Sequence, residues 1–317
     1  MLIILSGLAA IIPMSLYLYL IWKMDKYDRE PVKLVLANYL WGALGAVILA
    51  LMGSLILTSF VQIFISDEFD IDLFGSVIIA PFVEEITKGV FLLITITSRK
   101  FDNITDGIVY GGAIGLGFGM TENFLYFISN MDNISDWISI VIIRTLFSGV
   151  MHLVATATLG AFLGLSKFMI SPLRLVLGLI GLATAMLIHS LWNFFVSFDE
   201  TVLLGFIFMI ISVIIFVMVF KLSLSSERKM ILKELYEEVE LGLIPKFHLN
   251  LLSSPERDKT GWIDEKIRIP YIKYATTLAF RKKQMRLSNG SSKMFYQAEI
   301  DNCKSQISNL LNQINYI

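Results

Sequence analysis

Seven ionisable side chains stand in apolar stretches of this chain that a lipid bilayer could surround. They are Glu84, Glu85, Lys88, Glu122, Arg144, His152 and His189. Ionisable groups at membrane depth are costly, so they usually face a protein interior or a water-filled cavity and mark a functional site. Two of the three histidines of the chain belong to this set. The set therefore predicts one polar site inside the membrane.

Carboxylates and imidazoles that share a cavity can activate water in two ways, and both hydrolyse an amide bond. Two histidines with a carboxylate can bind a metal ion that keeps one position open for water. Alternatively, a glutamate in low-dielectric surroundings can be the general base, while a histidine or an asparagine stabilises the oxyanion. The chain has no HExxH, no GxSxG and no paired aspartates in an apolar stretch. These absences argue against a HExxH zinc protease, a serine hydrolase and an aspartyl intramembrane protease.

The composition is that of an integral membrane protein. Of the 317 residues, 56% are hydrophobic and only 17% are charged, and the mean hydropathy is +0.70. A soluble domain carries about 25% charged residues. A lipid bilayer is therefore the expected partner, and nucleic acid is not.

Seven stretches are long enough to cross a membrane as helices of about 20 mostly apolar residues. They span residues 2–22, 34–65, 73–97, 107–129, 137–165, 173–198 and 201–221. The expected fold is an all-α polytopic membrane protein with about seven transmembrane helices. Residues 1–221 would form the membrane domain.

The loops between these stretches alternate in charge. Three loops carry lysine or arginine, namely "KMDKYDREPVK", "SRKFDNITD" and "SKFMISPLR", whereas "SDEFDID", "NMDNISD" and "SFDE" carry only acids. Basic loops stay in the cytoplasm. The pattern predicts an N-terminus outside the cell and a cytoplasmic C-terminal tail.

Residues 222–317 differ from the rest of the chain in charge and pattern. Residues 221–317 hold 16 Lys and Arg against 11 Asp and Glu, whereas residues 1–220 hold 10 against 16. We expect a mostly helical cytosolic tail or small domain, and the alternative is a basic helix on the anionic inner leaflet. His248 is expected on the surface of this tail, and the lone Cys303 excludes an internal disulfide.

The site residues are expected in the middle to outer part of the membrane. At about 1.5 Å rise per residue, Glu84 lies roughly 17 Å and His152 roughly 22 Å from the outer end of their spans. Pairs spaced i,i+4 share a helix face, and the chain has three of them: Glu84 with Lys88, His152 with Thr156, and His189 with Asn193. The second member of each pair is expected to orient the first.

Two further features concern how the helices pack. Gly111, Gly115 and Gly119 are spaced by four, which lets a neighbouring backbone approach closely. The fourth apolar stretch is therefore expected at the centre of the bundle. Arg144 is expected to form an ion pair with an acid such as Glu122.

Four short motifs follow one another in the third to sixth apolar stretches. They are "EEITK" at 84–88, "FGMTEN" at 118–123, "HLVAT" at 152–156 and "HSLWN" at 189–193. Together with "DREP" at 28–31, they make residues 1–220 resemble the PrsW family. This family belongs to the superfamily of CAAX-processing and bacteriocin-immunity membrane proteases. The tail lies outside the resemblance.

The resemblance implies an intramembrane endopeptidase in a bacterial plasma membrane. Its substrate would be a single-span membrane protein cut near the outer face, as in the first cleavage of an anti-sigma factor. The implied catalytic residues are Glu84, Glu85, His152 and His189, and the supporting residues are Lys88, Glu122, Asn123 and Asn193. The alternative is a non-catalytic scaffold or an ion-coupled transporter with the same buried cluster.

The resemblance leaves the cofactor open between zinc and none. The ligands of a zinc ion would be Glu122, His152 and His189. However, CAAX-processing relatives carry a histidine where this chain has Glu122. This difference concerns Glu122, one of the three ligands named for the zinc ion, and puts that ligand assignment in question.

Overall fold

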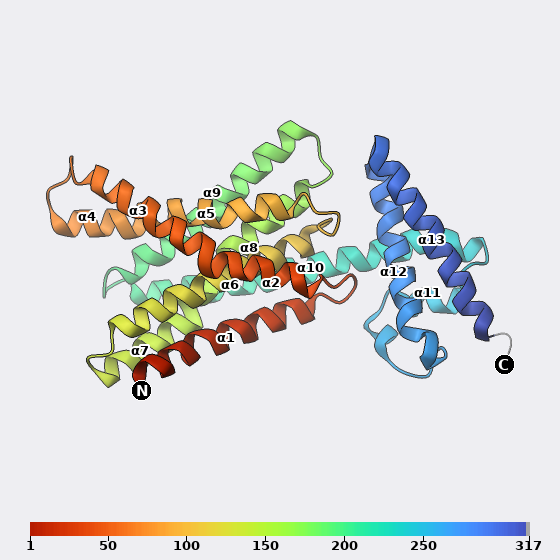
Figure 1. The fold of residues 1–317 in the computed structure, drawn as a ribbon, viewed down its shortest axis with the longest axis horizontal. Helices are drawn as coiled ribbons and strands as arrows, with labels where there is room; N and C mark the ends of the chain where they lie inside the picture. The colour runs from red at the N-terminus through yellow and green to blue at the C-terminus, as the bar shows by residue number, and fades with distance from the viewer. Residues whose placement is uncertain (315–317) are drawn as a thin grey trace. The chain divides into compact units, whose positions relative to one another are not determined.

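The computed structural model describes residues 1–314, and every regular element in that range is a helix (Figure 1). The α-helices are α1 (Leu2–Met24), α2 (Val32–Leu40), α3 (Val47–Val61), α4 (Glu68–Phe74), α5 (Ala80–Thr95), α6 (Ile104–Ser129), α7 (Ile134–Ile143), α8 (Gly149–Ser166), α9 (Ser171–Val196), α10 (Val202–Glu240), α11 (Lys246–Leu252), α12 (Glu265–Leu287) and α13 (Gly290–Ile314). Three π-helical segments, η1 (Trp41–Ala46), η2 (Gly75–Ile79) and η3 (Arg144–Ser148), and one 3₁₀ turn, η4 (Pro255–Asp258), complete the chain. The expected all-α fold is confirmed.

The chain divides into two compact units. The first contains Met1–Met24 and Glu30–Phe220, and the second contains Asp25–Arg29 and the chain from Lys221 onward. Helix α10 continues from the first unit into the second without a break. The short loop between α1 and α2 thus belongs to the same unit as the C-terminal helices.

Five helical segments are long and apolar enough to cross a membrane: Leu2–Met24, Val32–Val61, Ile134–Ser166, Ser171–Val196 and Val202–Glu240. The other two expected spans are also helical, as α4 to α5 and as α6. They are less hydrophobic than the five segments above, because one carries Glu84, Glu85 and Lys88 and the other is rich in glycine. The count of seven spans stays a prediction.

Helix α6 is the central helix of the first unit. It contacts α1, α2, α5 and α8, and every residue from Thr105 to Gly119 is buried. A capping box between Asn103 and Asp106 satisfies the first backbone amides of the helix. Because protein rather than lipid surrounds α6 from Thr105 to Gly119, this part of the helix does not need the hydropathy of a lipid-facing span.

Glycines set the distance between α6 and its neighbours. A Cβ added at Gly111 would lie 2.4 Å from the carbonyl oxygen of Thr156, and one at Gly115 would lie 2.2 Å from that of His152. On another face of α6, a Cβ at Gly117 would lie 2.0 Å from the carbonyl oxygen of Tyr39. The expected central position of this glycine-rich helix is therefore confirmed.

The π-helical segments are an unexpected feature. Each interrupts an otherwise α-helical span, and η2 leads directly into α5. A π turn disturbs the regular backbone ladder and often lies at a functional site. Two side chains of α9 bond to η2: the Ser190 hydroxyl donates to the carbonyl of Val77 at 2.6 Å, and the Asn193 amide donates to that of Ser76 at 2.8 Å. These bonds hold α9 against the segment that begins the site helix.

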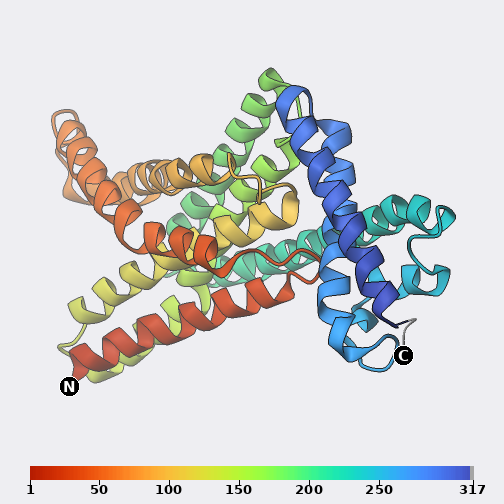
Figure 2. The same ribbon diagram turned by 45° about the vertical axis from the view of Figure 1, so that its right-hand side comes forward.

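The second unit has a hydrophobic core of its own. Helices α12 and α13 run side by side in both views (Figures 1 and 2).

Lys282 of α12 is buried, and its ammonium group donates to the carbonyl of Glu234 at 2.9 Å and to the carboxylates of Glu237 and Glu238. Arg281 is buried as well. These two charges of the basic helix are therefore unavailable to a lipid leaflet.

Two tail residues belong to this core rather than to the surface. His248 was expected to be exposed, but it is only 4% exposed because it packs among Phe247, Trp262 and Tyr271. Its Nδ1 lies 3.0 Å from the hydroxyl of Tyr271. Cys303 is buried as well, and its thiol is free because the chain has no second cysteine.

The second unit also contains the loop between α1 and α2. Tyr27 is part of its hydrophobic core, and its hydroxyl donates to the carbonyl of Ser253 at 3.1 Å. Arg257 donates to the carbonyls of Lys26 and Tyr27, and its guanidinium lies 5.0 Å from the centre of the Tyr27 ring. A residue from the first loop of the chain thus completes the core of the C-terminal unit.

Candidate active site

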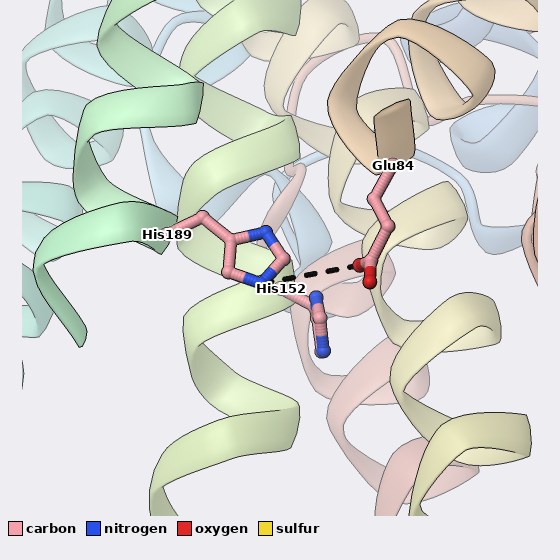
Figure 3. A group of neighbouring side chains, drawn as sticks. All are labelled: Glu84, His152 and His189. Atoms are coloured by element: carbon pink, nitrogen blue, oxygen red, sulfur yellow. Dashed lines mark ion pairs between the residues drawn. The ribbon is translucent and has the colours of Figure 1, made fainter. Parts of the chain in front are cut away.

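Three helices bring a glutamate and two histidines together inside the first unit. Glu84 comes from α5, His152 from α8 and His189 from α9, and their side chains point toward one another (Figure 3). The two imidazole rings meet edge to face, with centroids 4.9 Å apart. Glu122 of α6 lies next to His152, so the four helices expected to share one polar site do so.

Lys88 lies at the centre of this group. Its ammonium nitrogen is 3.2 Å from Glu84 Oε2, 2.8 Å from Glu85 Oε1 and 3.0 Å from His152 Nδ1. The face of the Phe118 ring covers it at 4.0 Å, and no part of the side chain is exposed. Lys88 contacts Glu84, its i,i+4 partner, as expected, and it also bonds to the second glutamate and to a histidine.

The Glu85 carboxylate is fully occupied by protein partners. Besides Lys88, its Oε1 contacts His189 Nδ1 at 3.0 Å, and its Oε2 accepts a hydrogen bond from the Thr156 hydroxyl at 3.1 Å. The side chain is 0% exposed. Glu85 therefore orients its neighbours and is closed to a substrate.

The hydrogen bond to Glu85 fixes the tautomer that we assign to His189. An ionised carboxylate can only accept hydrogen bonds, so the proton of this contact belongs to His189 Nδ1. The Nε2 atom then has a free lone pair, and it lies 3.9 Å from Glu84 Oε2. That separation is too long for a direct hydrogen bond and suits one water molecule that touches both atoms.

His152 has both ring nitrogens occupied. Nδ1 faces Lys88, and Nε2 lies 2.6 Å from Glu122 Oε2. Because the ammonium group can only donate, the proton of the ring belongs on Nε2, which donates to Glu122. Arg144 also bonds to Glu122 Oε2 at 2.6 Å, as expected from the sequence.

The asparagines of the motifs hold helices rather than the reacting groups. Asn123 Oδ1 accepts from Arg144 Nε at 3.0 Å and so fixes the cation that pairs with Glu122.

Asn193 bonds to η2 and not to His189, although the two residues share a helix face. Thr156 bonds to Glu85 on α5 instead of His152 on its own helix. The expected i,i+4 partners are wrong for both Asn193 and Thr156. Each side chain bonds instead to a backbone or carboxylate acceptor on a neighbouring helix.

A cavity of about 210 Å³ gives access to the cluster from the side of the bundle. It is lined by Val47, Ala50, Leu51, Ser54, Glu84, Phe118, Glu122, Leu125 and Tyr126. Of the cluster, only Glu84 and Glu122 line it, with side chains 11% and 23% exposed. Leu51 and Tyr126 at its edge are exposed on the outside of the unit.

Comparisons with known proteins identify the family. A sequence model described as "PrsW family intramembrane metalloprotease" matches residues 30–222. Protease PrsW of Bacillus subtilis (strain 168) is 29% identical over 199 residues, which is 62% of this chain and 83% of that protein. This chain belongs to the PrsW family.

Two further relatives within the PrsW family carry the same name. Protease PrsW of Oceanobacillus iheyensis is 32% identical over 195 residues, covering 60% of this chain and 80% of that protein. Protease PrsW of Clostridioides difficile is 29% identical over 162 residues, covering 51% and 66%. No solved structure matches the chain. The chain is thus a protease of bacterial membranes, and all four site helices lie in the region shared with PrsW proteins, whereas the tail lies beyond it.

The description of the PrsW family implies a metal ion, and three side chains have suitable donor types. The ligand atoms of Glu84, His152 and His189 lie within 4.8 Å of one another, and two histidines with a glutamate form a known catalytic zinc set. Glu122, which the sequence suggested as a ligand, lies outside this group of three.

The arrangement of these three residues does not fit a metal ion. His152 has no free nitrogen, and the ammonium group of Lys88 contacts both Glu84 and His152. An ion at this place would meet a positive charge that is already bonded to two of its three ligands. The cluster is thus arranged around an ammonium group.

Proposed function

We propose that this PrsW-family protease hydrolyses a peptide bond of a single-span membrane protein, with Glu84 as the general base. The observation that carries this assignment is the exposure of Glu84 to the lateral cavity, while Glu85 is closed off. Leu51 and Tyr126 at the cavity edge face the outside of the bundle. A membrane-embedded segment can therefore approach from the lipid.

The water that attacks the peptide would lie between Glu84 and His189. A water bonded to both Glu84 Oε2 and His189 Nε2, which lie 3.9 Å apart, would sit beside the line that joins the two atoms. Glu84 takes a proton from this water as its oxygen attacks the carbonyl carbon. The proton then passes to the leaving amine nitrogen, which completes general acid–base catalysis.

The remaining cluster residues hold these two groups in position. Lys88 and Glu85 connect α5 to α8 and α9, because Lys88 bonds to His152 and Glu85 bonds to His189. Glu122 and Arg144 then fix the other side of the His152 ring. A reacting group held by packed, bonded neighbours needs no rearrangement at the moment of reaction.

The substrate and the orientation rest on the sequence. The charge pattern of the loops supports an N-terminus outside the cell and a cytoplasmic tail. With this orientation, Glu84 and His152 lie toward the outer half of the membrane. A cut near the outer face would suit the first cleavage of a membrane-anchored regulator, such as an anti-sigma factor.

The test compares proteins shed by bacterial cells that carry the wild-type chain or Glu84→Gln. We expect mass spectrometry to find one or a few ectodomains released only by the wild type. The identified single-span protein, reconstituted in vesicles with purified enzyme, should be cut by the wild type and not by Glu84→Gln. Equal cleavage by both would show that Glu84 is not the base. A reporter fused after residue 221 tests the orientation separately, since it should behave as cytosolic.

A further inference from the structure

The ammonium group of Lys88 has as many acceptors as it has protons. Its three N–H bonds meet Glu84 Oε2, Glu85 Oε1 and His152 Nδ1 at 3.2, 2.8 and 3.0 Å. The Phe118 ring closes the remaining side. The Lys88 ammonium group therefore cannot reach a substrate, because the whole side chain is buried.

The acceptors of Lys88 overlap with the residues that a metal ion would need. Of the three side chains with metal-binding donors, Glu84 and His152 are both bonded to Lys88, and only His189 is not. A metal would have to take the lone pair of His152 Nδ1 from the ammonium group. It would also have to share Glu84 with a positive charge.

The other nitrogen of His152 offers no alternative. It faces Glu122 at 2.6 Å, and Arg144 bonds to the same carboxylate oxygen. To expose Nε2, the ring would have to leave this pair as well. Hydrogen bonds to Lys88 on one side and to Glu122 on the other therefore keep His152 from acting as a ligand.

We propose that the ammonium group of Lys88 is the resident cation of this centre and that it excludes a divalent metal from Glu84, His152 and His189. This inference deepens the proposed function, because it concerns the same Glu84. The lysine supplies the positive charge that keeps two adjacent buried carboxylates together, and it directs Glu84 toward the cavity. The centre then works as a glutamate-based hydrolase even though its family is described as metalloproteases.

The first experiment measures metal content in the full-length protein purified in detergent without chelators. We expect sub-stoichiometric zinc by elemental analysis and no binding of added Co²⁺ by absorption spectroscopy. The measurement needs no substrate. One zinc ion per wild-type chain that is lost in His189→Ala would overturn the proposal. That result would make Glu84 a metal ligand instead of the base, whereas the cleavage of a single-span protein is tested separately by the shedding experiment.

The second experiment removes the cation. Lys88→Met keeps a long side chain but removes the charge and the donors, so Glu84, His152 and His189 become available together. We expect this variant to rise from sub-stoichiometric zinc to about one ion per chain, held by three protein ligands as in catalytic zinc sites. The double variant with His189→Ala should lose that gain.

Arg144→Met is the matched control for the loss of a buried positive charge. It removes a cation from Glu122 rather than from the three donors, so it should gain no metal. A folded Lys88→Met protein that stays free of metal would overturn the claim that Lys88 is what excludes it. If Lys88→Met does not fold, the metal content of the wild type still decides the proposal.

Discussion

Glu84 and Glu85 are consecutive residues that share one cation, yet they differ in access. Both carboxylates contact the ammonium group of Lys88. Glu84 lines the lateral cavity, whereas Glu85 is 0% exposed and bonds to His189 and Thr156 as well. The difference follows from the helix, since neighbouring residues point about 100° apart around its axis.

This difference predicts opposite results for two amide substitutions. Glu84→Gln removes the base but keeps the shape, so we expect kcat to fall by about 10²- to 10⁴-fold with little change in melting temperature. Glu85→Gln removes a buried charge that Lys88 and His189 need, so we expect the free energy of unfolding to fall by on the order of 3 kcal/mol. Cleavage assays in vesicles and thermal unfolding in detergent measure the two effects. A stable but inactive Glu85→Gln beside an active Glu84→Gln would reverse the assignment.

The close contact of α6 with α8 predicts that Gly115→Ala displaces a site helix. The added Cβ would lie 2.2 Å from the backbone carbonyl oxygen of His152, which cannot rotate away. We expect a loss of about 1–3 kcal/mol in stability, together with reduced cleavage because α8 carries His152.

Gly112→Ala is the control for this substitution on the same helix. Its Cβ would meet a side-chain end, Leu153 Cδ1 at 2.7 Å, which can move. We expect this variant to keep most of its activity. If both alanine variants behave alike, backbone approach at Gly115 is not what sets the position of His152.

Much of the site could be predicted from the sequence because its signal is local. Buried charges in apolar stretches are rare, so Glu84, Lys88, His152 and His189 stand out without any structure. The spacing of glycines in α6 likewise predicts close helix packing. Composition and these patterns were enough to give the all-α class and the helices that carry the site.

The partners of those residues could not be predicted, because they depend on contacts between helices. Asn193 and Thr156 share a face with a histidine, but each bonds to another helix. The π turn at η2, which accepts the bond from Asn193, has no sequence signal of its own. His248 is buried because Tyr271 and Trp262 pack on it from another part of the tail.

The burial of His248 predicts that acid destabilises the tail unit. Desolvation lowers the pKa of His248 to about 4, compared with about 6.5 in an unfolded chain. As the pH falls, the unfolded tail therefore takes up a proton at a higher pH than the folded tail. The contribution of His248 to the free energy of unfolding is fully present above about pH 6.5 and is lost toward pH 4, by at most about 1.4 kcal/mol per pH unit. Hydrogen exchange of α11 and α12 between these pH values measures the loss. His248→Gln can still bond to the Tyr271 hydroxyl but cannot take up the proton, so hydrogen exchange in this variant should depend less on pH. If the pH dependence is unchanged, a group other than His248 causes it.

The lateral cavity predicts that one bulky residue on α3 blocks cleavage without disturbing the cluster. Ser54 lines the cavity that leads to Glu84, so the indole of Ser54→Trp would fill the space that a substrate segment needs. We expect a large fall in kcat/KM and an unchanged melting temperature, since no ion pair of the cluster involves Ser54. Ile56→Trp is the control, because Ile56 lies two residues away and is 66% exposed on the outside of the helix. Cleavage of the same reconstituted single-span substrate compares the two variants. If Ser54→Trp cleaves as fast as Ile56→Trp, the substrate reaches Glu84 by another route, and the cavity between α3 and α6 is not its entrance.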